Sequence, residues 1–228
     1  MVHPSNTIPS MNTPLTILIH GLHLNPCCMK PLAKKLEKHG LPTFCYGYKS
    51  LSQPIAINSQ RLHEYLLANH NPAQPINLVG HSLGGLVIRH FLAHYPMWQV
   101  HRCVTLGTPH RGSQTAHYAH RYLSPLINQS FLGALDGSCP PLREDVSLGI
   151  IAGNRPIGLG LPFLMLHSHR HKLDTDARQH DGAVYLSETL LPEAKDYLIL
   201  PVSHTGLLID QTVAAQTLHF LQHGCFLH

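Results

Sequence analysis

The segment 76–95 constrains the fold more than any other part of this sequence. A short apolar run at 76–79 leads directly into Gly-His-Ser-Leu-Gly-Gly at 80–85, and apolar residues at helical spacing continue until Pro96. This order predicts a buried strand, a tight turn and a helix at 86–95. Such a turn forces Ser82 into strained backbone angles, and the glycines let neighbouring backbone pass without a Cβ clash. The sequence therefore predicts an exposed serine hydroxyl at the end of a strand.

Two other interpretations of the glycine-rich turn stay open, because the five-residue pattern Gly-x-Ser-x-Gly is common by chance. One is a phosphate-binding loop, and the other is an ordinary tight turn. A phosphate loop requires a lysine directly after the glycines, and Leu86 stands there instead. We therefore favour a turn that carries a nucleophile, since a buried strand precedes it and an apolar helix follows it.

The remaining apolar segments alternate between strand and helix patterns. Strands are predicted at 15–19, 43–48, 76–79, 100–106, 147–152 and 197–200, and further helices at 31–39, 55–69 and 210–222. Alternation of this kind implies a parallel sheet with helices on both faces. We expect an α/β fold built on a minimal, mostly parallel six-stranded sheet.

The 228 residues suit one α/β domain, which we expect to cover 15–228 behind a polar leader at 1–14. Two stretches lack clear strands, 114–142 and 154–180, and insertions of this length are usually lids or binding loops. The first insertion contains apolar residues that could form a lid or acyl-chain wall over Ser82, or a short cap helix that completes the core. These residues are Leu123, Leu126, Ile127, Phe131 and Leu132.

Composition and charge exclude several classes of protein. Apolar residues make up 43% of the chain and charged residues 12%, which argues against disorder. The net charge of +4 is spread along the chain, so we do not expect a nucleic-acid partner. The basic stretch 30–38 is interpreted as a solvated helix face, with peripheral membrane contact as the minor alternative.

Neither a signal peptide nor a membrane-spanning segment is evident in the sequence. The first 14 residues are polar and contain three prolines, and no apolar stretch approaches the roughly 20 residues of a spanning helix. We expect a cytoplasmic location. The six cysteines lack paired spacings, so reduced and mostly buried thiols are predicted.

A serine nucleophile needs a histidine base within hydrogen-bond reach, and the sequence offers 21 histidines. With a nucleophile of this kind, the chain order runs serine, acid, histidine, and the histidine follows the last strand. His204 stands there, whereas His219, His223 and His228 lie in or beyond the last helix. His204 is therefore the predicted base.

The acid that orients the base should lie between the fifth strand and His204. The candidates by order are Asp174, Asp176, Asp181, Glu188, Glu193 and Asp196. Asp181 is favoured because the sequence Asp-Gly-Ala-Val is a turn running into an apolar stretch, which can aim a short carboxylate inward. Asp174 and Asp176 stand among basic residues, where solvated ion pairing is expected.

Acyl transfer also needs hydrogen-bond donors where the carbonyl oxygen becomes negative. The amide of Leu83 begins the helix after the serine, and the helix dipole favours negative charge there. The amide of Leu22 can supply the second donor from the loop after the first strand. His20 in that loop is interpreted as a positioning residue.

These motifs resemble those of bacterial lipases and related serine esterases of the α/β-hydrolase superfamily. The resemblance covers about 15–210 and includes His-Gly-Leu at 20–22, the serine turn, Gly-Thr-Pro-His-Arg-Gly-Ser at 107–113, Asp-Gly-Ala-Val at 181–184 and His-Thr-Gly at 204–206. It implies that Ser82, Asp181 and His204 form a triad and that Leu22 and Leu83 form the oxyanion hole. The first strand matches the third strand of larger members. A signal peptide and a calcium site, which secreted members carry, are not evident.

The predicted activity is hydrolysis of a carboxylic ester, on a small-molecule or lipid substrate, through an acyl-serine intermediate without a cofactor. An acyltransferase or a thioesterase could use the same residues, and an inactive lipid-binding module is the alternative outside enzymes. His167, His169 and His171, with His180 downstream, could hold zinc, although a solvated loop is the favoured interpretation. Cys27 and Cys28 are expected to pack or lie exposed, without an activating partner.

Overall fold

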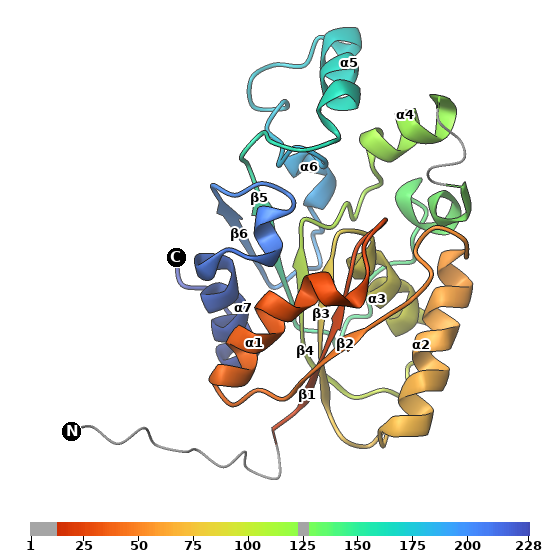
Figure 1. Ribbon diagram of the computed structural model, residues 1–228, viewed down its shortest axis with the longest axis vertical. Coiled ribbons are helices and arrows are strands. Elements are labelled where there is room, and N and C mark those ends of the chain that lie inside the picture. Colours follow the sequence, from red (N-terminus) through yellow and green to blue (C-terminus); the bar gives the residue numbers. More distant parts are fainter. Residues whose placement is uncertain (1–12, 123–127) are drawn as a thin grey trace, which may run out of the picture.

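The computed structural model describes residues 13–122 and 128–228, which form a parallel six-stranded sheet covered by helices (Figure 1). The strands are β1 (Leu15–Ile19), β2 (Thr43–Tyr46), β3 (Ile76–His81), β4 (Val100–Leu106), β5 (Leu148–Gly153) and β6 (Asp196–Leu200). Their spatial order is β2-β1-β3-β4-β5-β6, and every neighbouring pair is parallel. The predicted α/β fold is confirmed. All six strands end at one edge, where ligands bind in open α/β folds.

Helices pack on both faces of the sheet, as the alternation of elements predicted. α1 (Lys30–Lys38) and α7 (Gln211–His223) contribute to the core on one face, and α2 (Ile55–Asn69) and α3 (Leu83–His94) to the core on the other. Consecutive residues of β1 alternate between the two, since Ile17 packs with α2 and α3 while Leu18 packs with α1 and α7. This strand is therefore buried on both faces, as its continuous apolar run predicted.

The serine turn is tighter than the sequence predicted. β3 continues to His81, two residues beyond the predicted end, and α3 begins at Leu83, three residues before the apolar helical stretch at 86–95. This start agrees with the expectation that the Leu83 amide begins the helix, and tertiary packing overrides the low helix propensity of Gly84 and Gly85. Ser82 alone separates the strand from the helix.

Both strandless insertions contain helices that stand beyond the carboxyl edge of the sheet (Figure 1). The first holds α4 (Gln114–Tyr122) and the short helical turns Asn128–Ser130 and Phe131–Leu135. The second holds α5 (Leu161–His171), and α6 (Leu186–Thr189) follows it. The predicted solvated loop around the clustered histidines is therefore wrong, because most of that segment is helical.

The apolar stretch in the first insertion divides between core and surface. Phe131 is buried in the core on the α2 and α3 face, whereas Leu132 is 68% exposed. Leu123, Leu126 and Ile127 lie outside the described residues. Phe131 thus fits the interpretation of a cap that completes the core.

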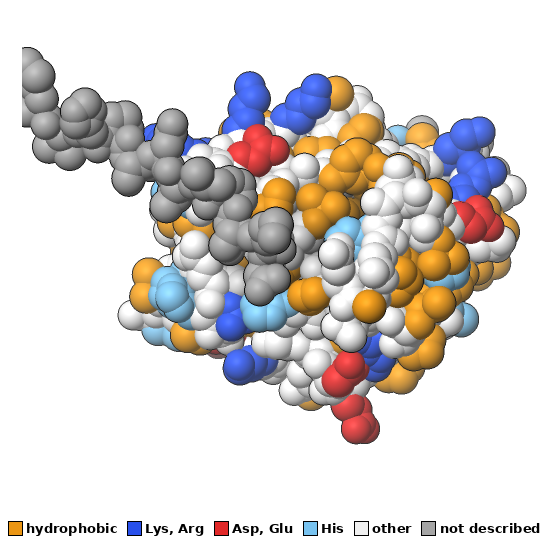
Figure 2. Space-filling model, turned by 90° about the horizontal axis from the view of Figure 1, so that it is seen from below, with side chains coloured by type: hydrophobic (Ala, Val, Ile, Leu, Met, Phe, Trp, Pro, Cys, Tyr) orange, Lys and Arg blue, Asp and Glu red, His pale blue; other side chains and the backbone are white. Residues whose placement is uncertain are grey.

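The arrangement of positive charges on the described surface agrees with their spread along the sequence. On the face seen in Figure 2, the Lys and Arg side chains lie in small separate groups and not in one stripe. In α1, Lys30, Lys34 and Lys38 are exposed while Leu32 and Leu36 are buried, as expected for a solvated helix face. No helix in the described part of the chain is long and apolar enough to cross a membrane.

All six cysteines have free thiols, but the prediction that most of them are buried is wrong. Only Cys103 and Cys139 are buried, whereas Cys27 and Cys225 are exposed and Cys28 and Cys45 are intermediate. Spacing along the chain carries no information about exposure, which depends on how loops and strand edges are covered.

Candidate active site

Ser82 lies at the sharp turn between β3 and α3 with a backbone conformation that few residues adopt. Its φ and ψ angles are 53° and −123°, and a positive φ is strained for a residue with a side chain. The Ser82 amide still donates to Leu106 O over 2.9 Å, and Thr108 Oγ1 donates to Ser82 O over 2.9 Å. The surrounding structure thus holds the strained turn in place from the neighbouring strand.

Three glycines around the serine allow this turn because no side chain fits at their positions. A Cβ on Gly80 would lie 2.6 Å from Gly85 N, and one on Gly84 would lie 2.3 Å from Ile19 O. A Cβ on Gly85 would lie 2.1 Å from Thr108 Oγ1. The glycine spacing of the motif therefore follows from close backbone packing of α3 against β1 and β4.

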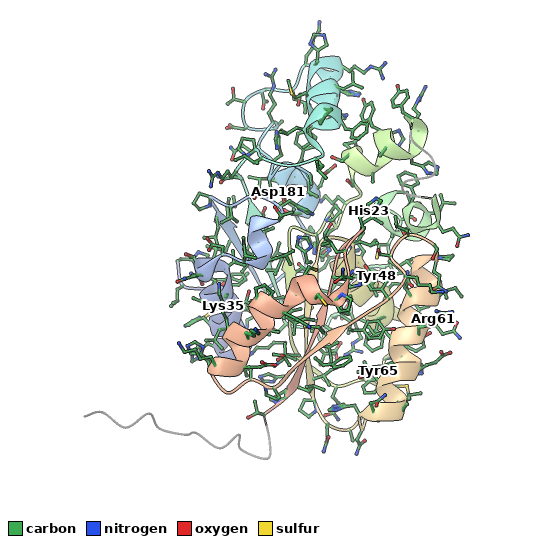
Figure 3. All side chains as sticks on the ribbon, viewed as in Figure 1. His23, Lys35, Tyr48, Arg61, Tyr65 and Asp181 are labelled. Carbon is green, nitrogen blue, oxygen red and sulfur yellow. The ribbon has the colours of Figure 1, made fainter. Side chains whose placement is uncertain are left out.

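The Asp181 carboxylate lies against the imidazole of His204. Asp181 Oδ2 and His204 Nδ1 are 2.6 Å apart, and the His204 amide donates to Asp181 O over 2.8 Å. The other carboxylate oxygen, Oδ1, accepts from the amides of Ala183 and Val184 over 2.9 and 2.8 Å. The side chain of Asp181 is 2% exposed and that of His204 is 13% exposed. In Figure 3, Asp181 lies at the carboxyl edge of the sheet.

Electrostatics favour the ionised form of this buried aspartate. Burial alone opposes its charge, but His204 and the two backbone amides outweigh burial and lower the pKa of Asp181 below its ordinary value. A charged carboxylate at Nδ1 keeps a proton on that nitrogen, which leaves Nε2 free to accept one.

His81, the residue before the serine, contacts the histidine-bearing loop. Its Nε2 donates to His204 O over 3.0 Å, and the two rings are 4.7 Å apart. Burial, with the neighbouring His204 adding to it, lowers the pKa of His81 to about 3. His81 is therefore neutral, and it holds the backbone of His204 against the serine turn. Sequence reasoning missed this residue, although its place in the serine motif was a visible signal.

Ser82 and His204 lie in one region of the carboxyl edge, as the close packing around two glycines indicates. A Cβ on Gly21 would lie 2.9 Å from Ser82 Cβ and 3.0 Å from His81 Nδ1. A Cβ on Gly107 would lie 3.1 Å from His204 Nδ1 and equally far from Asp181 Oδ2. Among the described residues, the Ser82 hydroxyl makes no hydrogen bond, so the contact between Oγ and His204 Nε2 is not formed here.

The amides of Leu22 and Leu83 have no hydrogen-bond acceptor among the residues that the structure describes. Leu83 is the first residue of α3, where backbone N–H groups lack a partner within the helix. Leu22 follows the buried His20, whose ring stacks on Tyr48 at 4.5 Å between centroids. Tyr48 also donates from its hydroxyl to His20 O over 2.9 Å. His20 therefore fixes the loop, as interpreted from the sequence.

None of the other acids considered for the site forms a hydrogen bond or ion pair with His204 in the described part of the chain. Glu188 is buried, and its Oε1 and Oε2 accept from the amides of Gln114 and Tyr185 over 2.5 and 2.8 Å. Burial raises the pKa of Glu188 to about 8. Asp196 accepts from the Phe226 amide, whereas Asp174, Asp176 and Glu193 are exposed.

The histidine cluster does not have the arrangement of a zinc site. The alternate spacing of the three histidines would place them on one face of a strand. The segment is helical instead, so His169 is turned away from His167 and His171. Within residues 13–122 and 128–228, no group of three or more His, Cys, Asp or Glu side chains is arranged to hold a metal ion.

Comparison with known families matches the first half of the chain. The family described as "Putative serine esterase (DUF676)" matches residues 9–130, slightly more than half of the 228 residues. Two triacylglycerol lipases, from Pseudarthrobacter phenanthrenivorans and Burkholderia plantarii, are each 45% identical to the chain over 93 residues. That segment is 39% of this chain but only 28% and 25% of the two lipases.

Solved structures share the fold over nearly the whole chain. The mature form of the Bacillus licheniformis lipase BlEst2 has a TM-score of 0.71 at 21% identity, covering 92% of this chain and 93% of its own. The metagenomic carboxyl esterase MGS0156 has a TM-score of 0.64 at 20% identity, covering 86% and 65%. The phospholipase PlaB from Legionella pneumophila also reaches 0.64, at 15% identity, covering 92% and 60%.

Proposed function

Because the chain belongs to the DUF676 family of serine esterases, within the α/β-hydrolases, we propose that it hydrolyses carboxylic esters with Ser82 as nucleophile. In this proposal His204 is the base, Asp181 orients it, and the amides of Leu22 and Leu83 form the oxyanion hole. The substrate is a small-molecule or lipid ester, which agrees with the names of the related lipases.

The proposed reaction has two acyl-transfer steps. Ser82 Oγ attacks the ester carbonyl while its proton passes to His204 Nε2, and the carbonyl oxygen becomes an oxyanion between the two amides. The carbon–oxygen bond to the alcohol then breaks, and the alcohol leaves with the proton from Nε2. Water, deprotonated by the same nitrogen, attacks the acyl-serine and releases the acid.

The observation that carries this proposal is that a strained, partly exposed serine and the hydrogen-bonded Asp181–His204 pair lie at one edge of the sheet. The positive φ of Ser82 has a cost that a glycine would avoid, and strained residues of this kind cluster at active sites. The two unpartnered amides also support the proposal, since an oxyanion hole requires backbone N–H groups that are free to donate.

A series of p-nitrophenyl esters of increasing acyl length tests the proposed activity. The wild type should release p-nitrophenol, and Ser82→Ala and His204→Ala should each reduce kcat by roughly 10⁴-fold or more. His219→Ala, which alters a histidine outside the site, serves as the matched control and should keep wild-type turnover. Full activity in Ser82→Ala would refute the proposal.

A further inference from the structure

A groove between α4 and α5 is lined by basic side chains from both helices. Its volume is about 380 Å³, and its lining residues are Gln114, His117, Tyr118 and Arg121 of α4 and His167, Arg170 and His171 of α5. Residues three and four apart share a helix face, so each of these sets occupies one face of its helix. Two basic helix faces therefore oppose each other across the groove.

Positive groups in this groove lack a compensating negative charge. No carboxylate is among the lining residues, and the rings of His167 and His171 are only 4.4 Å apart. Burial lowers the pKa of His167, and the neighbouring His171 and His117 lower it further. A bound anion would favour the charged form of His167 and so oppose this lowering of its pKa.

Hydrogen-bond donors in the groove are also left without protein acceptors. Arg170 reaches from α5 to α4, where Nη1 donates to the Tyr122 hydroxyl over 3.4 Å. A guanidinium has five N–H donors, so most of those on Arg170 stay available to a ligand.

The donor set fits a phosphate better than a carboxylate. A carboxylate has two acceptor oxygens, whereas a phosphate monoester has three terminal oxygens and carries up to two negative charges. Planar guanidinium groups bind such oxygens in pairs, and Arg121 and Arg170 supply one guanidinium from each helix. The imidazoles of His117 and His171 would add further N–H donors.

Hydrogen bonds link both walls of the groove to the turn that carries Asp181. Thr115 Oγ1 on α4 donates to Ala183 O over 2.6 Å, and the Tyr185 hydroxyl donates to Leu164 O on α5 over 2.6 Å. Ala183 and Tyr185 follow Asp181 by two and four residues. The groove is therefore built on the same segment as the candidate active site.

We propose that the groove between α4 and α5 binds a phosphate group, carried by the alcohol part of an ester substrate. The assignment to a substrate rests on the proposed esterase function, whereas phosphate binding does not. The shared chemistry is a phosphate with at least two free oxygens. Inorganic phosphate and glycerol 3-phosphate are suitable probes of binding, because neither contains an ester of a carboxylic acid.

Calorimetric titration of the full chain with these two probes tests phosphate binding without any turnover. The double variant Arg121→Gln/Arg170→Gln should weaken binding by roughly 100-fold, about tenfold for each lost guanidinium. The matched control Lys34→Gln/Arg61→Gln removes two exposed positive charges from α1 and α2 and should bind like the wild type. Arg61 lies on α2, away from α4 and α5 (Figure 3).

Three results of the titration would overturn phosphate binding. In the first, the wild type binds neither probe. In the second, the wild type and the Arg121→Gln/Arg170→Gln variant bind equally well. In the third, the wild type binds butyrate as tightly as glycerol 3-phosphate. Since Arg121 and Arg170 are exposed, the double variant should fold normally, and its circular dichroism spectrum checks this.

Hydrolysis of a matched ester pair tests the source of the phosphate. The wild type should have a higher kcat/KM for 1-hexanoylglycerol 3-phosphate than for 1-hexanoylglycerol, and the double variant should lose this preference while keeping turnover of the neutral ester. Equal hydrolysis of both esters by the wild type would overturn the substrate assignment. Hydrolysis of neither ester would count against the esterase function, and the titration would still decide phosphate binding.

Discussion

The short hydrogen bond between Asp181 Oδ2 and His204 Nδ1 decides which imidazole nitrogen is free in the candidate site. Two backbone amides fix the other oxygen of the carboxylate, so the carboxylate cannot rotate without losing them. The carboxylate therefore controls both the tautomer and the orientation of His204. Neither effect survives replacement of the carboxylate by an amide.

Asp181→Asn should reduce kcat by about 10⁴-fold, because an asparagine NH₂ group cannot accept the proton of Nδ1 and favours the wrong tautomer. Steady-state hydrolysis of a p-nitrophenyl ester measures this. Asp176→Asn, at an exposed aspartate five residues earlier, is the matched control and should retain wild-type kcat. Near-normal kcat in Asp181→Asn would assign the orienting acid elsewhere.

His81 is expected to act as a positioning residue through its hydrogen bond to His204 O. His81→Leu should lower kcat by roughly 100-fold with little change in KM, because a small displacement of His204 disturbs proton transfer more than substrate binding. His81→Gln keeps a donor at similar reach and should recover part of kcat. Equal losses in the two variants would show that packing, and not the hydrogen bond, explains the effect.

Packing between elements explains what the sequence could and could not predict about the site. The strands, the serine turn and the Asp-Gly-Ala-Val turn were predictable because each depends on local residues. The close approach of Gly84 in α3 to the carbonyl of Ile19 in β1 was not, because these residues are far apart in the chain. Contacts such as the one between His81 and His204 span 123 residues and leave no local pattern.

Arg89 connects α3 to two loops and is expected to be important for stability. It is buried, and its guanidinium donates to the carbonyl oxygens of His110 and Pro140 over 2.7 Å each. Arg89→Ala should lower the free energy of unfolding by about 3 kcal/mol, because these buried carbonyls lose their donors. Urea unfolding followed by fluorescence of the single tryptophan, Trp98, measures this.

The control for this prediction is Arg61→Ala, at an exposed arginine of α2. Its free energy of unfolding should stay within about 0.5 kcal/mol of the wild-type value. If Arg89→Ala and Arg61→Ala lowered the free energy of unfolding equally, the buried hydrogen bonds of Arg89 would not explain the loss.

Glu188 links the start of α4 to α6 and should make stability depend on pH. Burial raises its pKa from 4.5 to about 8 in the folded protein, so the folded state binds more protons than the unfolded state between these values. Its contribution to stability is therefore complete below the lower value and is lost as pH rises through the higher one. In Glu188→Gln, the free energy of unfolding should decrease less between pH 4.5 and about 8 than in the wild type. Urea unfolding at several pH values measures this. The same pH dependence in both proteins would contradict the raised pKa of Glu188.

For the whole molecule, the sequence predicted the sheet, its parallel order and the two covered faces from the alternation of apolar segments. It offered a short cap helix as one alternative for the first insertion, but it did not predict that α4 and α5 face each other, because this arrangement depends on contacts between segments far apart in the chain. We propose that 15–228 forms one domain, since the helices of both insertions are hydrogen-bonded to the turn after β5. The related lipases are much longer, so their remaining parts have no counterpart in this match.

The central claim, that Ser82 is the nucleophile, is tested most directly by the site of covalent modification. The protein is treated with a fluorophosphonate, digested, and examined by mass spectrometry to locate the phosphonyl group. We expect a single stoichiometric adduct on Ser82, formed slowly or not at all in His204→Ala. An adduct on another residue, or no adduct in a folded wild-type protein that hydrolyses esters, would contradict it.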